Sequence, residues 1–241
     1  MFFRPNQLVS RHEDPLSLFP RVVTKLHSIW ISLTYPFASR GSGLSIHYTC
    51  RLARSQAYRI KFGSSVRISK DVWLNALANG GDDPVIVIDD RCDVGGRCQI
   101  SAKNRIHLER DVILSASVLV MDHSHRYDDV TLPIGDQGVT EGGRIRIGQG
   151  CWIGHGAAIV CTKGELILGR NCVVAANALV TRSFPPYSVI SGNPARVVKQ
   201  FDPVKNMWVL GSSPVVTNDL PEKNSKMSDS DPDHVASAIH I

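Results

Sequence analysis

The chain has 241 residues, of which 43% are hydrophobic, and this fraction is sufficient for one continuous core. Its formal charge of +5 is mildly basic, but it contains no run of five or more Lys and Arg, which argues against a nucleic-acid partner. No apolar stretch approaches the length of a bilayer-spanning helix, and the first residues lack the apolar core of a signal peptide. We therefore expect a cytoplasmic protein.

An amphipathic helix is predicted within the N-terminal segment, residues 1–45. Apolar residues recur there at intervals of three and four, which is the helical period. They are Leu16, Leu18, Phe19, Val22, Val23, Leu26, Ile29, Trp30 and Leu33. The simpler interpretation is a helix that packs on the first coil of the main body. The alternative stays open: a weak association with anionic lipid at the inner face of the membrane, through a thin cationic face that includes Arg21 and Lys25.

From about residue 60 an aliphatic residue returns at every sixth position, with three interruptions. The residues of this series are Ile60, Val66, Val72, Ile88, Val94, Ile100, Ile106, Val112, Val118, Ile147, Ile153, Ile159, Leu168, Val174 and Val180. A fixed period that continues this long predicts a solenoid rather than independent helices or strands. Because each unit is too short to bury a core alone, stability must come from contacts between successive coils.

The position two residues before these aliphatic residues is also expected to point inward, where only small side chains fit. The small residues found there are Ser64, Cys92, Cys98, Ala116, Cys151, Ala157, Cys172 and Ala178. This interpretation explains most of the six cysteines as buried small groups, without a disulfide or metal role. Lys70, Asn104, Arg110 and Asp122 occupy the same phase, so each should mark an end, a distortion or a functional opening.

The longest interruption is a polar loop, residues 121–144, that carries two histidines. A regular scaffold interrupted once by such a loop is typical of a site presented by rigid elements. A neutral imidazole with an ordinary pKa near 6.5 is suited to general-base chemistry. Both His123 and His125 are candidates for this base. Asp122 could orient an imidazole through its carboxylate, and an ordinary turn-forming Asp is an equal alternative.

The coils should end within residues 184–199, where three prolines and Gly192 interrupt the pattern. The following segment, residues 201–241, turns to Ser, Asp, Asn, Lys and Pro. We expect this C-terminal extension to be largely disordered.

The repeats, the loop, residues 151–154 (Cys-Trp-Ile-Gly) and residues 192–198 (Gly-Asn-Pro-Ala-Arg-Val-Val) together resemble the hexapeptide-repeat acyltransferases. The resemblance is strongest to the maltose/galactoside O-acetyltransferase branch, and especially to capsule, exopolysaccharide and lipopolysaccharide O-acetyltransferases. It implies an all-β fold: a left-handed parallel β-helix over residues 46–200, with a short N-terminal helix and a disordered C-terminal tail. It also implies a homotrimer with active sites at subunit interfaces and acetyl-coenzyme A (acetyl-CoA) as the donor.

Site roles follow from this resemblance residue by residue. The general base is assigned first to His125, with His123 as the alternative. The coenzyme A contacts are assigned to His155, Ala157, Ala176, Thr181, Arg182, Arg196 and Lys199, with a main-chain amide near residues 154–155 as an oxyanion donor. Acceptor contacts are assigned to Asn104, Asp122 and Tyr127, with Gln137 as a further candidate. Arg182 and Lys199 stand where the family has Lys and Arg, which preserves charge but changes phosphate geometry.

The predicted function is transfer of acetyl from acetyl-CoA to a sugar hydroxyl of a polysaccharide or its lipid-linked precursor. One alternative is a serine or amino-sugar N-acyltransferase of the same superfamily. Another is a metal-dependent protein of the carbonic anhydrase kind, which would need a third nitrogen ligand beside His123 and His125. The spacing of the other histidines does not supply it, so no metal is expected. A non-catalytic binding scaffold is a further alternative.

Overall fold

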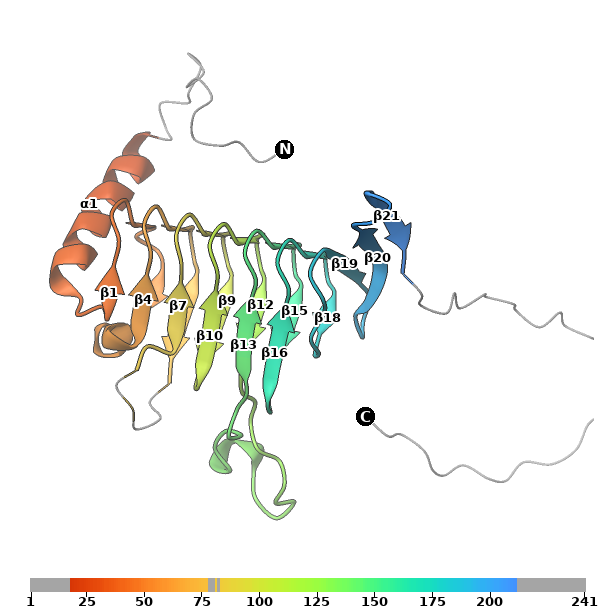
Figure 1. The fold of residues 1–241 in the computed structure, drawn as a ribbon. Helices are drawn as coiled ribbons and strands as arrows, with labels where there is room; N and C mark the ends of the chain where they lie inside the picture. Colours follow the sequence, from red (N-terminus) through yellow and green to blue (C-terminus); the bar gives the residue numbers. More distant parts are fainter. Residues whose placement is uncertain (1–17, 78–80, 82, 212–241) are drawn as a thin grey trace, which may run out of the picture.

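The computed structural model describes residues 18–77, 81 and 83–211. The main body is a solenoid in which successive coils each add one strand to three parallel sheets (Figure 1). We name these sheets A, B and C in the order in which the chain visits them.

Each sheet stacks one strand from every coil. Sheet A contains β1 (Ser39–Arg40), β4 (Ile60–Phe62), β7 (Ile86–Ile88), β10 (Arg105–Leu108), β13 (Arg144–Ile147) and β16 (Glu165–Leu168). The parallel part of sheet B contains β2 (Ser45–Ile46), β5 (Arg67–Ile68), β8 (Asp93–Val94), β11 (Ile113–Leu114), β14 (Trp152–Ile153), β17 (Val173–Val174) and β19 (Ser188–Ser191). Sheet C contains β3 (Arg51–Leu52), β6 (Trp73–Ala76), β9 (Gln99–Ala102), β12 (Leu119–Met121), β15 (Ala158–Val160) and β18 (Leu179–Val180). The predicted fold class, a left-handed parallel β-helix, is confirmed.

The core is a set of aliphatic columns that run along the solenoid axis. In sheet B, for example, Leu114 lies opposite Val94 of the preceding coil and Ile153 of the following coil. Every aliphatic residue of the predicted series is at most 1% exposed. Burial of such columns, at about 25 cal/mol for each Å² of apolar surface, is the main stabilising contribution in a fold with so little local structure.

The six-residue series nevertheless mixes two positions of the coil. Val94 is the register partner of Ile68 in the preceding coil and of Leu114 in the following coil. Cys92 stands at a corner two residues before Val94. Val66 and Val112 stand two residues before Ile68 and Leu114, so they occupy this corner position and not the strand position of Val94. Ser64 and Ala116, which were predicted to occupy that corner, are only half-buried, and Lys70 and Arg110, at the same predicted phase, are exposed. The predicted series moves from one position to the other because some turns contain extra residues. Leu108 of sheet A is equivalent to Ile100 of sheet C but follows it by eight residues, not six. Cys92, Cys98, Cys151 and Cys172 are buried as predicted.

At most of the A-to-B and B-to-C corners, the residue before the buried corner residue adopts a left-handed conformation with positive φ. Examples are Asp71, Arg91, Asp111 and Asn171, each of which directly precedes a buried Val or Cys. This conformation turns the chain between two sheets, and it is costly for residues that have a Cβ. The buried residue that follows each of them holds the corner in place.

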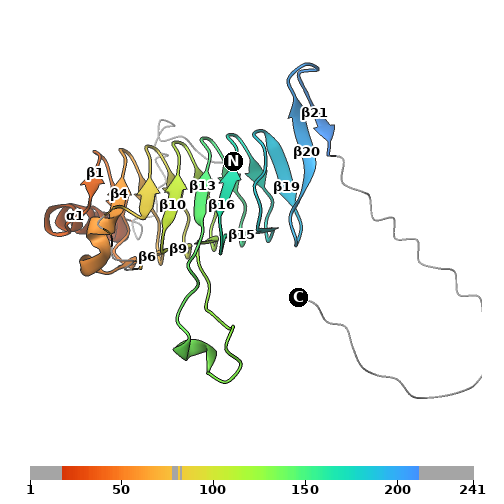
Figure 2. The same cartoon turned by 60° about the horizontal axis from the view of Figure 1, so that its bottom comes forward.

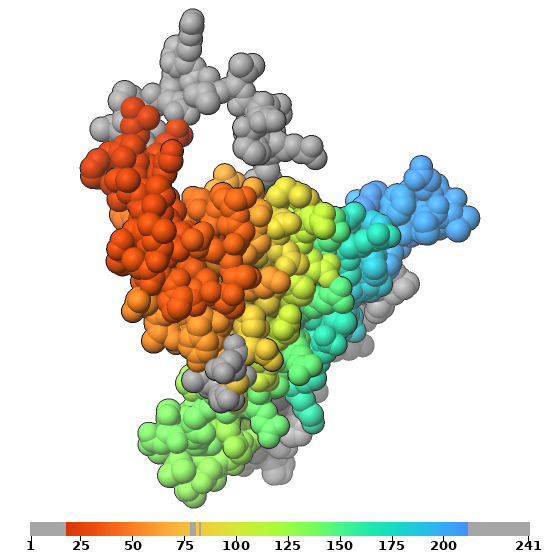
Figure 3. Space-filling model, turned by 60° about the vertical axis from the view of Figure 1, so that its left-hand side comes forward, coloured from red at the N-terminus to blue at the C-terminus, as the bar shows by residue number. Residues whose placement is uncertain are grey.

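Helix α1 (Leu18–Thr34) lies across the N-terminal end of the solenoid (Figures 1 and 3). It contacts β2 chiefly through Ser28, whose hydroxyl accepts the N–H of Ile46 at 2.9 Å and lies 3.1 Å from its carbonyl oxygen. The helix packs on the first coil, but of the apolar residues that define its predicted period none is buried, and most are exposed. Polar contacts of Ser28 and His27 to the strand edge at Ile46, together with the buried side chain of Ile31, therefore hold α1 on the solenoid. In the part of the chain that the structure describes, no helix is long and apolar enough to cross a membrane.

The C-terminal end of the solenoid is capped by an antiparallel hairpin. After β19, strand β20 (Arg196–Asp202) reverses direction, pairs with β19, and continues into β21 (Met207–Leu210) (Figure 2). The parallel coils thus end within residues 184–199, as predicted. Phe201, Asp202 and Met207–Leu210 are in strands within the segment expected to be largely disordered, and the part of that segment from residue 212 on lies outside the described residues.

Candidate active site

The loop leaves the solenoid after β12, at the corner between sheets C and A, and returns at β13. It projects away from the coils and has a short 3-10 turn, η3 (Ile134–Asp136), near its tip (Figures 1 and 2). Its base is a narrow antiparallel neck: Ser124 and Thr140 exchange hydrogen bonds, and His125 pairs with Val139. This neck fixes the conformation of the chain around both histidines.

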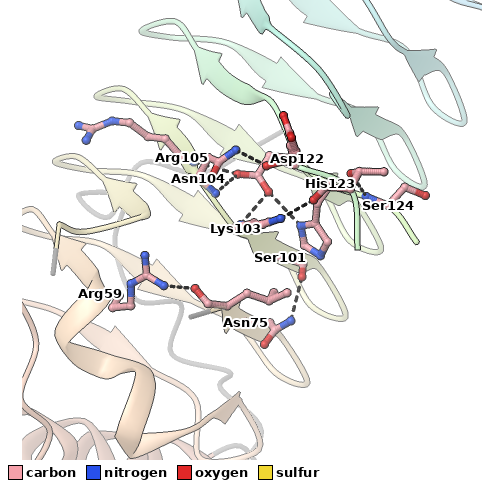
Figure 4. Close-up of polar contacts among 12 residues, drawn as sticks. Arg59, Asn75, Ser101, Lys103, Asn104, Arg105, Asp122, His123 and Ser124 are labelled. Carbon is pink, nitrogen blue, oxygen red and sulfur yellow. Dashed lines mark hydrogen bonds and ion pairs between the residues drawn. The ribbon is translucent and has the colours of Figure 1, made fainter. Parts of the chain in front are cut away.

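Asp122 is the polar centre of the corner and is fully buried. Its Oδ1 accepts the backbone N–H of Lys103 at 2.7 Å, and its Oδ2 accepts those of Asn104 and Arg105 at 2.8 Å each (Figure 4). Lys103 and Asn104 form the turn between β9 and β10, one coil earlier, and Arg105 is the first residue of β10. Bonds from amides to a buried carboxylate are among the stronger hydrogen bonds in proteins. The carboxylate therefore joins two successive coils where the loop departs.

His123 completes this arrangement. Its side chain is 8% exposed and its Nδ1 lies 2.9 Å from Asp122 Oδ1. Because a carboxylate can only accept a hydrogen bond, Nδ1 must carry the proton, and Nε2 of the neutral ring then holds a lone pair. The carboxylate thereby sets both the tautomer and the orientation of the ring, which is the arrangement that a general base requires.

A polar row on the outer side of sheet C lies beside His123 and was not predicted. Ser101 is only 2% exposed, and its hydroxyl accepts the Nδ2–H of Asn75 at 2.9 Å. Asn75, Ser101 and His123 come from three successive coils and lie near one another in Figure 4. The only signal in the sequence was the pair of polar residues at equivalent positions of β6 and β9, because Asn75 and Ser101 are register partners.

The structure brings some of the predicted acceptor residues together and separates others. Asn104 accompanies Asp122, but its Nδ2 donates to Glu141 O at 2.8 Å and so braces the returning end of the loop. Tyr127 is 71% exposed, farther out on the loop, and His125 is also exposed, within the neck. Gln137 donates to main-chain oxygens of its own loop. Of the two loop histidines, His123 and not His125 contacts the Asp122 carboxylate.

The predicted coenzyme A residues lie on later coils and at other places on the surface. His155 and Ala176 are exposed at the B-to-C corners, and Thr181 and Arg182 are exposed after β18. Arg196 and Lys199 are exposed on β20. The methyl group of Ala157, in contrast, is fully buried in the core, as its place in the repeat demands, so its side chain cannot line a surface groove. Its backbone is also buried: the N–H donates to Gly154 O at 3.2 Å and the carbonyl oxygen accepts the N–H of Leu119 at 3.0 Å.

Two features near these residues bear on cofactor binding. A Cβ on Gly154 would lie 2.6 Å from Ala176 N and 2.7 Å from Val174 O, so glycine is required where the corners stack. Beside the terminal hairpin, a hollow of about 550 Å³ is lined by Arg182 and by residues of β20 and β21. The Arg182 guanidinium lies 5.2 Å from the centre of the Phe184 ring, which holds this charge at the rim.

Within one chain, the His123 corner and the His155 corner are separated by the width of sheet C. Residues 116 to 122 span this width, which is roughly 20 Å at 3.3 Å per residue. In the described ranges, 18–77, 81 and 83–211, no three His, Cys, Asp or Glu side chains converge as a metal site would require.

Comparisons with known proteins agree with this picture. The Mycobacterium tuberculosis protein Rv3034c, whose name describes an acetyltransferase, is 32% identical to this chain over 165 residues. The matched region covers 66% of this chain and 48% of Rv3034c. The Escherichia coli protein WbbJ, whose name describes a lipopolysaccharide biosynthesis O-acetyl transferase, is 26% identical over 66% of this chain and 83% of its own length. The N-acyltransferase AntD of Bacillus cereus has the same fold, with a TM-score of 0.59 at 16% identity over 73% of this chain and 90% of AntD. The resemblance to hexapeptide-repeat acyltransferases is confirmed.

This hexapeptide-repeat chain spans about half the length of its mycobacterial relative. No family model matches it.

Proposed function

We propose that this protein transfers an acetyl group from acetyl-CoA to a sugar hydroxyl of a polysaccharide or its lipid-linked precursor, in the cytoplasm. The observation that carries the proposal is the buried contact between Asp122 and His123 at the base of the only long loop among the described residues. The names of the two curated relatives support acetyl transfer, and that of WbbJ supports a glycan acceptor. The proposed acceptor is a chemical class, sugar hydroxyls, and not one particular sugar.

In this mechanism His123 Nε2 accepts the proton of the acceptor hydroxyl while the hydroxyl oxygen attacks the thioester carbonyl carbon. The negative charge moves to the carbonyl oxygen, where the main-chain N–H of His155 would stabilise it, because the N–H of Gly154 already donates to Val174 O at 2.7 Å. The tetrahedral intermediate then expels the thiolate of coenzyme A, which receives the proton from the imidazolium. Asp122 keeps the ring oriented and stabilises its charge while the proton resides there.

The geometry favours His123 over His125 as the base. His123 has a buried carboxylate partner at 2.9 Å, whereas His125 is exposed in the loop neck. A matched pair of variants separates them: His123→Asn keeps a donor toward Asp122 but removes the Nε2 lone pair, and His125→Asn removes the second ring. We expect His123→Asn to reduce kcat by a factor of about 10² to 10⁴, and His125→Asn to change it by less than about threefold. The reverse ranking, measured as release of free coenzyme A, would assign the base to His125.

We propose further that the active site forms between subunits of a homotrimer, because one chain alone holds His123 and the His155 corner roughly 20 Å apart. His155, Ala176, Thr181, Arg182, Arg196 and Lys199 of one copy would then bind the donor beside His123 of another. These residues are all exposed: the three cations can contact the phosphates, and the corner at His155 and Ala176 is open to the pantetheine arm.

Subunit complementation tests this arrangement directly. Ala176→Trp should block the donor groove, and His123→Asn should remove the base, so each variant alone is inactive. When the two are coexpressed and mix at random, about one quarter of the interfaces combine an intact base with an intact groove, and activity should return to about that fraction. If both single variants are inactive and the mixture stays inactive, the site lies within one chain. Substrate pairs that differ only in a hydroxyl or an amino group would distinguish O-acetylation from N-acylation.

A further inference from the structure

Helix α1 presents its most apolar side to solvent. Leu18, Phe19, Val22, Leu26, Ile29, Trp30 and Leu33 are 50–76% exposed. At 100° per residue these seven positions fall within one continuous sector about 120° wide. The opposite side, with Ser28 and Ile31, contacts the solenoid and is the only buried part of the helix. A contiguous exposed stripe of large apolar side chains is unusual on a soluble surface and marks a contact with another phase or molecule.

The same end of the solenoid is strongly basic. Residues 18–70 contain no Asp or Glu. They contain Arg21, Lys25, Arg40, Arg51, Arg54, Arg59, Lys61, Arg67 and Lys70. Except for Arg59, which is buried, these cations are exposed, and Arg67 forms an ion pair with Asp93 of the next coil. The concentration of one charge sign on one end of the molecule creates a positive potential there.

Cations flank the apolar stripe at close range. Arg21 and Lys25 lie along one border of it, on α1 itself. Together with Arg40 and His47 they line a groove of about 800 Å³ between α1 and the first coil. The red and orange end of the molecule in Figure 3 is formed by this helix and coil. An apolar stripe bordered by Lys and Arg is the pattern of a helix that lies in the interface of a bilayer.

We propose that α1 and the first coil dock on a bilayer surface that contains anionic lipid, with the apolar stripe among the acyl chains and the cations at the headgroup phosphates. A second copy of this chain is a poorer occupant, because contact between two such ends would bring the same positive charges together. The inference is independent of acetyl transfer, since the surface is at the N-terminal end and the base is on the fourth coil.

Vesicle co-sedimentation of the full chain tests the proposal. Vesicles of phosphatidylcholine alone are compared with vesicles in which about one third of the lipid is phosphatidylglycerol. We expect binding to the anionic vesicles to be at least about tenfold tighter, and to weaken as salt concentration rises. Lys25→Glu should weaken this binding by about tenfold or more, since each basic residue near the surface contributes about fivefold and the reversal changes two charges.

Matched controls come from the other end of the molecule. Lys205→Glu makes the same charge change in the exposed turn of the terminal hairpin, and should leave binding unchanged. Leu26→Asn and Leu33→Asn, at 63% and 76% exposure, should weaken binding, whereas Val204→Asn, at 93%, should not. Circular dichroism confirms that these surface variants fold.

Three results would overturn the proposal. The first is equal binding to both kinds of vesicle, or to neither. The second is an equal effect of the stripe variants and their controls. The third is a loss of self-association in analytical ultracentrifugation for Leu26→Asn and Leu33→Asn with vesicle binding intact, which would make a second copy the occupant of the stripe.

Discussion

Replacing Asp122 by Asn should affect stability and catalysis through two separate consequences of one change. The carboxylate accepts three backbone N–H groups at 2.7–2.8 Å and the Nδ1–H of His123 at 2.9 Å. An Asn side chain has the same shape but only one oxygen. Its better orientation keeps the bonds from Asn104 and Arg105, and turns the NH₂ group toward the N–H of Lys103.

The expected loss of stability follows from that count. One buried N–H loses its acceptor, which costs about 1–3 kcal/mol, and the two retained bonds lose their charge assistance. A total of about 2–4 kcal/mol should lower Tm by roughly 5–15 °C in a domain of this size. The Asn NH₂ also faces His123, so Nδ1 becomes an acceptor and the proton moves to Nε2. In that tautomer Nε2 has no lone pair to take the proton of the sugar hydroxyl, so kcat should fall by a factor of about 10² to 10⁴.

Asp128→Asn is the matched control for this prediction. Asp128 lies in the same loop with its side chain 69% exposed, and its ion pair with Arg126 is at the surface, so the free energy of unfolding should change by less than about 0.5 kcal/mol. Thermal unfolding and coenzyme A release are measured on both variants. An Asp122→Asn protein with wild-type Tm and wild-type kcat would refute the proposed role of the buried carboxylate. A lowered Tm with full kcat would retain the structural role and refute the catalytic one.

Two further predictions concern the solenoid. Gly154→Ala should destabilise the protein by about 1–3 kcal/mol, because its Cβ would meet backbone atoms of Val174 and Ala176, whereas Gly135→Ala, with no atom within 4 Å, should be neutral in the same thermal unfolding assay. Burial raises the pKa of Cys92 to about 12 and that of Cys98 to about 11, from 9.0, so neither should react with a thiol reagent at pH 8 until the protein is unfolded. Since these raised values favour the neutral thiol in the folded state, their stabilising contribution is complete below pH 9 and is lost as pH rises toward 11. A slope in the free energy of unfolding over this range that Cys98→Ala leaves unchanged would contradict the assignment to Cys98.

The solenoid could be predicted because the aliphatic residues that form its core recur with a fixed period in the sequence. Residues such as Ile100 and Val174 had to be buried in any stacked arrangement, and they are. The phase at the corners could not be read reliably, because the turn between Ile100 and Leu108 inserts two extra residues and the pattern stays aliphatic on both sides of it. When the six-residue period is continued across such an insertion, it reaches corner residues such as Val112 in place of strand residues such as Leu114.

The loop and its histidines could also be located from the sequence, but the choice between them could not. His123 and His125 are two residues apart in the same polar segment. The sequence does not show that Asp122 is buried against the β9–β10 turn, and this burial is what places the carboxylate beside His123. The side of α1 that faces the solenoid could not be predicted for a related reason. Its apolar period is correct, but the side that touches the solenoid is determined by the hydrogen bonds of Ser28 to the open edge at Ile46.

The way the loop is fastened has an evolutionary consequence. Gly143 N donates to Asp122 O at 2.6 Å, and Asn104 fastens Glu141, so both ends of the excursion are tied to the coils at a single junction. Residues beyond that junction carry no coil-to-coil pairing. Insertions, deletions or recombination there can therefore change the surface of the loop while the solenoid keeps its register. If the loop contacts the acceptor, as the proposed function implies, acceptor specificity can diverge among related proteins without any change in the folding of the coils.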